Sequence, residues 1–246
     1  QIHERVPELR GYDLPSILET LKRAIREELD FSIEGRNAVI FNRRNPFSDR
    51  VFAPEVFEEF TSGKLLVTEF VEGSPPHETG LPLERREDLA RTGGRSVFHQ
   101  TLIDGFFHSD PHHGNLLVTS DERICFLDWG QAGQLTRKMR FILADLFEAI
   151  TDQDPVRVAS IASDIGPRIA DVDTQELELA VRRVLDRYGP DMNVGDIGRI
   201  MIDLLYVFGT HGVDIARDYT LLAKAIVSID QVGHQLDPGF DITDIA

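Results

Sequence analysis

Residues 107–115 read FHSDPHHGN, and residues 126–130 read FLDWG. Between these polar segments lie two short apolar runs, LLV at 116–118 and ICFL at 124–127, separated by TSDER at 119–123. Two short apolar runs joined by a polar turn predict a β-hairpin. Such a hairpin would hold the histidine-rich loop and Asp128 at one end, so we expect the two polar segments to lie together.

The loop could belong to a transition-metal cluster. Zinc hydrolases use the ligand types that it offers, which are His108, Asp110, His112 and His113. Such a site needs further ligands from later strands. The other histidines fall in predicted helices, linkers or chain ends, so the sequence favours a second chemistry.

The second chemistry is that of a phosphotransferase. Asp110 and Asn115 are five residues apart, and Asp128 follows the next strand pair, as the catalytic and metal-binding residues of protein kinases do. Asp110 would orient the proton of an acceptor hydroxyl or water. Asn115 and Asp128 would supply hard oxygen ligands for Mg²⁺. The candidate catalytic residues are therefore Asp110, Asn115 and Asp128, and we expect His108 to anchor the loop by hydrogen bonds and packing.

A helix is predicted from residue 13 onward, because apolar residues recur at steps of three and four from Leu14 to Leu29. If that helix continues, Asp30 and Glu34 are like charges one turn apart, which is unfavourable by about 0.2–0.5 kcal/mol. Two interpretations stay open. Either the carboxylates lie on a solvated face, or cations reach them from elsewhere in the protein.

The middle of the chain predicts an antiparallel hairpin from VFAPEVFEEFTSG at 51–63 and KLLVTEFVEG at 64–73, followed by a linker at 74–76. Beyond the linker a helix closes at Asp104-Gly105, and four or five amphipathic helices follow Thr136. Their predicted breaks are at 154–155, 166–167, 189–190 and 212. The fold class is α+β, with a small part at 1–72 and a larger α-rich part at 73–246.

Composition narrows the function. The chain carries 26 Lys and Arg against 42 Asp and Glu, a net charge of −16, which argues against binding nucleic acid. The lone cysteine, Cys125, rules out an internal disulfide and lies in an apolar run, where a packed core thiol is expected. The chain has no stretch of 18 apolar residues, so we expect no membrane-spanning helix.

Three stretches together resemble the UbiB family of atypical protein-kinase-like proteins (ABC1 or aarF-domain proteins). They are EELDFSIEGRN at 27–37, GFFHSDPHHGNLLV at 105–118 and ICFLDWG at 124–130. The resemblance implies a two-lobed protein-kinase-like fold, with a partial small lobe (helix C and a β-hairpin) and a mostly α-helical large lobe. It also implies roles for single residues: an E-x-D motif at Glu28 and Asp30, a helix-C glutamate at Glu34, and an adenine-binding hinge at Thr68, Glu69 and Val71.

The resemblance further implies a Mg²⁺-dependent ATPase or small-molecule phosphotransferase that supports ubiquinone and isoprenoid lipid metabolism. ATP and Mg²⁺ would be its cofactors, and a quinone-like or lipid molecule its candidate partner. We expect a cytoplasmic location with a peripheral contact to the inner face of the membrane. The family's phosphate-binding lysine strand and K-x-G-Q segment do not occur in this sequence. We therefore expect an N-terminally truncated piece that is inactive by itself.

Two departures from the family pattern are Trp129, in place of phenylalanine, and His113, in place of proline. A tryptophan after the metal-binding aspartate also occurs in aminoglycoside- and choline-kinase-like enzymes. Those enzymes normally have leucine where this chain has Pro111, and they lack the E-x-D segment. A small-molecule kinase of that kind and a catalytically incompetent nucleotide-binding scaffold are the alternatives.

Overall fold

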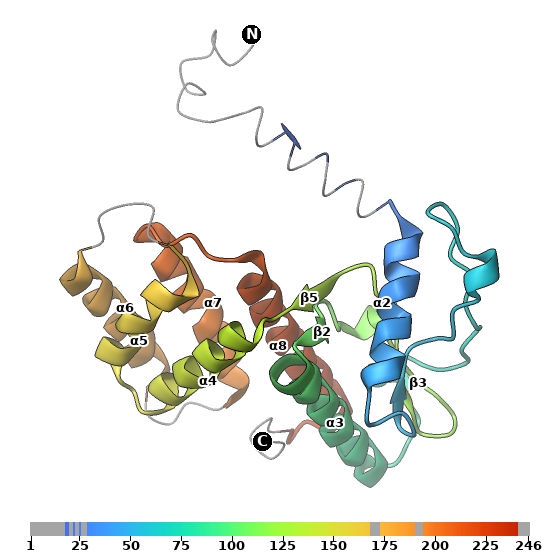
Figure 1. Ribbon diagram of the computed structural model, residues 1–246. Coiled ribbons are helices and arrows are strands. Elements are labelled where there is room, and N and C mark those ends of the chain that lie inside the picture. Colours follow the sequence, from blue (N-terminus) through green and yellow to red (C-terminus); the bar gives the residue numbers. More distant parts are fainter. Residues whose placement is uncertain are drawn as a thin grey trace, which may run out of the picture.

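The structure is a computed structural model that describes residues 18, 19, 22, 25, 29–167, 173–189 and 194–240. Short strands lie beside helix α2, and helices make up most of the remaining chain (Figure 1). The predicted α+β class is confirmed.

Helix α2 (Phe31–Arg44) starts just after Asp30 instead of continuing through it. The Asp30 carboxylate accepts hydrogen bonds from the backbone N–H of Ser32 at 3.1 Å and from its hydroxyl at 2.6 Å. These bonds hold the pKa of Asp30 below its usual value. Asp30 is thus an N-cap, and Glu34 lies in the first turn, where the helix dipole favours a carboxylate. The like-charge pair within one continuous helix does not arise.

A three-stranded sheet has the order β1-β4-β3. The hairpin predicted at 116–127 is confirmed, because β3 (Leu116–Val118) runs antiparallel to β4 (Ile124–Phe126) with Leu116 opposite Phe126. Strand β1 (Val51–Phe52) pairs with β4 in parallel. β1 belongs to the first arm of the hairpin predicted at 51–73, which we call the small hairpin. Instead of pairing within that hairpin, β1 joins the sheet of the later hairpin.

The small hairpin itself pairs at two isolated antiparallel bridges, Val56 with Thr68 and Ser62 with Leu65. A 3₁₀ turn at Glu58–Phe60 interrupts the first arm. Pro54, which has no backbone N–H to donate, follows β1 closely. The antiparallel pairing is present, but it does not form a continuous ladder.

A second sheet joins β2 (Phe106–His108) to β5 (Ala132–Gln134) in antiparallel register, with His108 opposite Ala132. Helix α3 (Leu83–Phe98) and a π-helical turn (His99–Asp104) lead into β2. Gly105 closes that turn at φ 71°, a left-handed conformation that suits glycine. The two sheets bracket residues 109–115 and 127–131.

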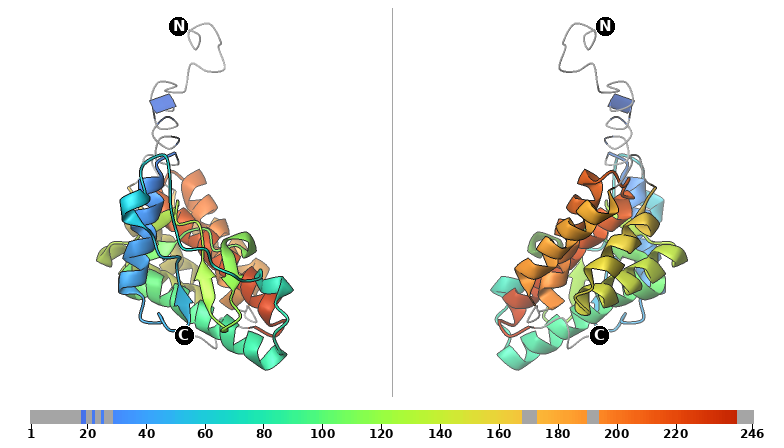
Figure 2. Two further views of the ribbon diagram at one scale, coloured as in Figure 1. Left: turned by 90° about the vertical axis from the view of Figure 1, so that its right-hand side faces the viewer. Right: turned by 90° about the vertical axis from the view of Figure 1, so that its left-hand side faces the viewer.

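The C-terminal helices confirm the predicted breaks. They are α4 (Arg137–Thr151), α5 (Pro155–Ile165), α6 (Thr174–Tyr188), α7 (Val194–Thr210) and α8 (Arg217–Leu236). Side chains of Thr136, Asp154 and Asp173 cap the first three by accepting backbone hydrogen bonds. Figure 2 shows α4 to α7 gathered on the side of the molecule away from α2.

Helix α8 joins the two hydrophobic cores. Its Tyr219 and Leu222 pack into the core of helices α4 to α7. Its Ile229, Val232 and Leu236 pack into the core beneath α2, α3 and the three-stranded sheet. α8 therefore runs through the middle of the molecule (Figure 1) and can carry side chains to both parts.

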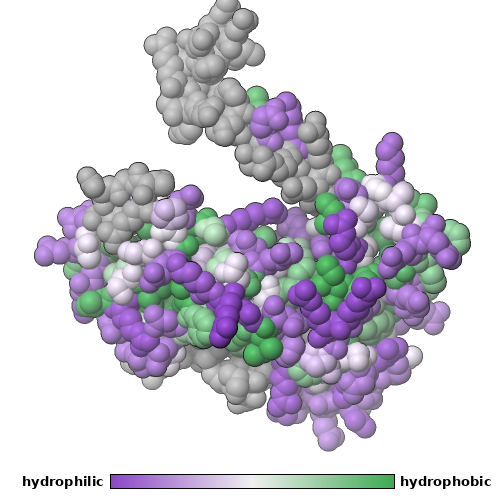
Figure 3. Space-filling view, in the orientation of Figure 1, coloured by the Kyte–Doolittle hydropathy of each residue, from purple (hydrophilic) through white to green (hydrophobic). Residues whose placement is uncertain are grey.

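The surface is largely hydrophilic on the face drawn in Figure 3, and its apolar residues are interspersed among polar ones. Within the described ranges, no helix is both long enough and apolar enough to cross a bilayer.

Candidate functional site

His108 lies at the end of β2 and is 1% exposed. Its backbone N–H donates to Gln100 Oε1 at 3.0 Å, and its Nδ1 accepts from the backbone N–H of Asp110 at 3.1 Å. Because Nδ1 accepts, the ring hydrogen is on Nε2, which lies 2.8 Å from the carbonyl oxygen of Leu127. Burial lowers the pKa of His108, and the neutral ring makes both of the bonds at its nitrogens. The side chain thereby ties the loop to the end of the hairpin.

Asp110 follows two residues later and remains accessible, with 28% of its side chain exposed. Its Oδ2 lies 2.9 Å from Lys224 Nζ of α8 and 3.8 Å from His112 Nε2. Its carbonyl oxygen accepts from the His112 backbone N–H at 2.8 Å and from Asn115 Nδ2 at 3.2 Å. These two bonds to the Asp110 carbonyl hold the loop together, while the Asp110 carboxylate points out of the loop toward α8.

Asn115 and Asp128 are brought to the same end of the hairpin. The backbone N–H of Leu127 donates to the Asn115 carbonyl at 2.8 Å, which extends the β3–β4 pairing by one step. Asp128, the next residue, is exposed and has a φ of 45°. Its Oδ1 accepts from the Gly130 N–H at 3.2 Å. A non-glycine residue in this left-handed region is strained, and such residues gather at functional sites.

Trp129 packs directly behind Asp128 and is 1% exposed. Its ring stacks on Phe41 of α2, with centroids 4.5 Å apart, and meets the His108 ring edge-on at 4.7 Å. Its indole N–H donates to the Phe126 carbonyl at 3.1 Å, while its own carbonyl accepts from Asn37 Nδ2 at 2.8 Å. Trp129 therefore connects α2, the anchored loop and the hairpin.

The predicted hinge residues lie on the second arm of the small hairpin. Thr68 bridges Val56, and the Glu69 backbone N–H donates to the Glu55 carbonyl at 2.8 Å. This N–H is engaged, which leaves the Glu69 carbonyl and the backbone of Val71 as the groups to consider for adenine. Ser74 exchanges two backbone hydrogen bonds with Val118 of β3, at 2.8 and 2.9 Å, and so holds the segment beside the hairpin.

The structure describes only part of the E-x-D segment. Glu28 lies outside the described residues. Asp30 caps α2, as described above, and Glu34 is half-buried in the first turn of that helix.

The donor set fits Mg²⁺ better than a transition metal. In the part of the chain that the structure describes, no three His, Cys, Asp or Glu side chains are grouped to hold a metal. The oxygen atoms of Asn115 and of the exposed Asp128 carboxylate are the hard ligands that Mg²⁺ takes together with phosphate and water. Cys125, by contrast, is fully buried, and burial raises the pKa of its thiol to about 12.

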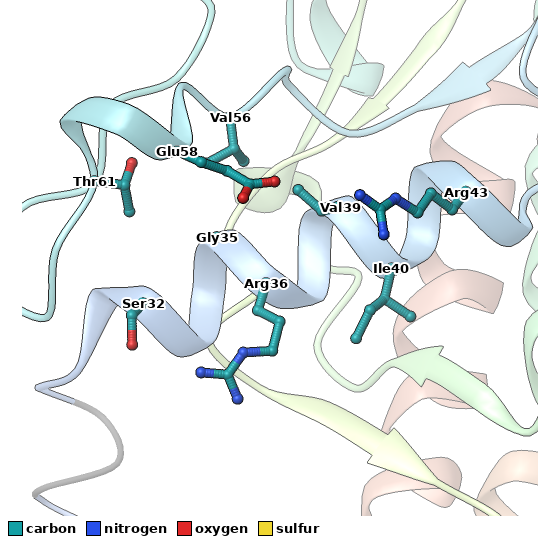
Figure 4. A pocket seen from close by; sticks show the side chains of 9 residues that line it. All are labelled: Ser32, Gly35, Arg36, Val39, Ile40, Arg43, Val56, Glu58 and Thr61. Carbon is teal, nitrogen blue, oxygen red and sulfur yellow. The ribbon is translucent and has the colours of Figure 1, made fainter.

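A separate pocket of about 360 Å³ lies between α2 and residues 56–61 (Figure 4). Arg36 and Arg43 of α2 line it together with Glu58. None of the predicted site residues belongs to its lining. Since Asn37 and Phe41 contact Trp129, α2 uses one face for the hairpin and another for this pocket.

The anchored loop, the β3–β4 hairpin and the flanking helix α2 are arranged as in a protein-kinase-like fold. Residues 1–162 match the ABC1 atypical kinase-like domain, and residues 181–241 match the UbiB helical domain. The chain therefore belongs to the UbiB family of ABC1 atypical kinase-like proteins.

Two similar relatives are named as probable protein kinase UbiB. The protein of Xylella fastidiosa (strain M23) is 32% identical over 99% of this chain and 46% of its own length. That of Xanthomonas campestris pv. campestris (strain B100) is 31% identical over 99% of this chain and 45% of its own length. The chain thus spans about half the length of these relatives.

A solved structure, the complex of Rv3197 with erythromycin from Mycobacterium tuberculosis, has a similar fold. The TM-score is 0.61 at 18% sequence identity, over 92% of this chain and 59% of that one. At this level of identity the likeness supports the fold alone.

Two residues that contact the predicted site were missed by sequence reasoning. Gln100 precedes β2 and holds the His108 backbone, and Lys224 lies far along the chain on α8. The one signal for Lys224 was a single lysine within the apolar run LLAKAIV at 221–227.

Proposed function

We propose that the protein containing this chain is a Mg²⁺-dependent phosphotransferase or ATPase that binds ATP between a small lobe (1–72) and a large lobe (73–246). The observation that carries the proposal is the placement of Asp110, Asn115 and Asp128. One hairpin and one anchored loop bring these three residues to the same end of the β3–β4 pair. Membership of a kinase-like family supports the same assignment.

In the proposed mechanism, Asp110 is the residue that handles the proton. Its exposed carboxylate accepts a hydrogen bond from the acceptor hydroxyl or water and takes up the proton as the oxygen attacks the γ-phosphorus. Asn115 uses its Nδ2 to hold the Asp110 carbonyl, which leaves its Oδ1 for metal. Asp128 is the anionic metal ligand. A bound Mg²⁺ supplies neutralisation of charge on the β- and γ-phosphates.

The remaining predicted residues complete the nucleotide site. We assign the adenine to Thr68 and the backbone of Glu69 and Val71, and we assign Glu34 to a cation that holds the α- and β-phosphates. Glu28 and Asp30 form the E-x-D motif of the proposal. The position of Asp30 as the N-cap supports a role in fixing the start of α2.

We further propose that this activity supports ubiquinone or isoprenoid lipid metabolism, with a quinone-like or lipid acceptor. The cellular location that fits is the cytoplasm, with a peripheral contact to the inner face of the membrane. The support is the name of the relatives, probable protein kinase UbiB, and the family resemblance.

The test removes the proposed metal ligand in the whole protein. Asp128→Ala should abolish Mg²⁺-dependent binding of ATP, measured by titration calorimetry with and without Mg²⁺, together with phosphate release. Asp186→Ala is the matched control, because Asp186 is an exposed carboxylate on α6, remote in sequence from the loop. Wild-type affinity for Mg-ATP in Asp128→Ala would refute the metal assignment. Tight binding by the wild type without turnover of nucleotide would favour the scaffold alternative.

A further inference from the structure

The carboxylate proposed to handle the proton has a cationic partner from the last described helix. Lys224 Nζ of α8 lies 2.9 Å from Asp110 Oδ2. The lysine side chain is 52% exposed, so its ammonium group reaches both the carboxylate and solvent. This pair joins the anchored loop to the region that matches the UbiB helical domain.

The helix backbone that carries Lys224 is held in place by buried neighbours and by a hydrogen bond to β5. Ala223 and Ala225, its neighbours on α8, are fully buried. Near the start of α8, the Asp218 carboxylate accepts a hydrogen bond from the Gln134 backbone N–H at 2.8 Å. Gln134 belongs to β5, which pairs with β2, the strand that ends at His108. The same framework therefore positions Lys224 and the loop that carries Asp110.

The loop has no strong cation of its own. Residues 105–117 contain neither lysine nor arginine. Among the described residues, the other ion-pair partner of Asp110 is His112, at 3.8 Å, which is charged only when protonated. Transfer of a phosphoryl group places negative charge beside the catalytic aspartate, where a fixed positive charge stabilises the transition state.

We propose that Lys224 is a positioning residue for phosphoryl transfer: it orients the Asp110 carboxylate and keeps a fixed positive charge beside it. This inference rests on the proposed function. In the step, the acceptor oxygen forms a bond to the γ-phosphorus, and the bond from that phosphorus to the β,γ-bridging oxygen breaks. The acceptor proton passes to Asp110, and ADP leaves with the bonding electron pair.

The experiment uses the whole protein and three variants. Lys224→Met removes the charge, Lys224→Arg keeps it, and Lys138→Met removes an exposed lysine from α4 as the matched control. We expect Lys224→Met to lower kcat for phosphate release or transfer by about 10- to 100-fold, a loss typical of removing a partner that orients a functional side chain. The KM for ATP and the thermal midpoint should change little, because an exposed ion pair contributes little to stability. Lys224→Arg should keep most of the activity, and Lys138→Met all of it.

A second measurement does not depend on turnover. Lysine-specific acetylation, read by mass spectrometry, should be slowed at Lys224 by Mg²⁺ with a non-hydrolysable ATP analogue and unchanged at Lys138. A kcat in Lys224→Met within twofold of the wild type, or no protection of Lys224 by bound nucleotide, would overturn the role of Lys224 alone. Failure of the wild type to bind Mg-nucleotide would overturn the proposed function, and this inference with it.

Discussion

Trp129 offers the sharpest test of how α2 is coupled to the site, because it is buried among aromatic rings from three elements. A large aromatic side chain buries about 150–250 Å², which at about 25 cal/mol per Å² corresponds to about 4–6 kcal/mol. Truncations of buried aromatic residues to alanine measure about 3–5 kcal/mol. We expect Trp129→Ala to lower the free energy of unfolding by about 3–5 kcal/mol.

Trp129→Phe should cost less, because an aromatic ring still faces Phe41. It removes the hydrogen bond from the indole N–H to the Phe126 carbonyl, and a buried carbonyl that loses its partner costs about 1–3 kcal/mol. A double-mutant cycle between Phe41→Ala and Trp129→Ala should give a coupling of about 0.5–1.5 kcal/mol, the value typical of stacked aromatic pairs.

The measurement is urea unfolding followed by far-ultraviolet circular dichroism, since the Trp129 variants lack the only tryptophan of the chain. Phe70→Ala is the matched control, because Phe70 is 87% exposed and its loss should change stability by no more than about 0.5 kcal/mol. Trp129 does not couple α2 to the site if Trp129→Ala costs no more than Phe70→Ala, or if the substitutions at Phe41 and Trp129 add without coupling.

Two further predictions concern the strand pair that carries the loop. Burial lowers the pKa of His108 below its usual 6.5, so the unfolded chain takes up this proton first as pH falls. The corresponding stability is complete above about pH 6.5 and is lost toward the lower, folded-state pKa. His108→Gln should therefore flatten the dependence of the urea midpoint on pH below about pH 6.5. Gly133→Ala should destabilise the chain by about 1–3 kcal/mol, because a Cβ there would lie 2.1 Å from the Phe107 ring. Gly80→Ala, which meets no atom within 4 Å, should be neutral in the same thermal and urea assays, and equal effects of the two substitutions would contradict the packing argument.

Some features around the loop between β2 and β3 could be predicted from neighbouring residues in the sequence, and others could not. The hairpin at 116–127 and the breaks between the C-terminal helices were predicted from turn residues and apolar runs, and the structure confirms them. The placement of Asn115 beside Asp128 followed from that hairpin, because its register alone brings the two residues to one end. The N-cap at Asp30 was missed, although Asp30 and Ser32 supplied a local signal, because the apolar stripe upstream suggested one continuous helix.

The sequence by itself determined the elements and the order of the site residues, because a turn, a cap or an apolar run depends on neighbouring residues. Only the tertiary structure decided which distant segments meet. It paired β1 with β4, seated Trp129 against Phe41 of α2, and brought Lys224 of α8 to Asp110. These contacts join residues far apart in the chain, and they depend on how the two cores pack around α8. No local pattern encodes that packing, since the free energy that selects it is spread over many buried side chains.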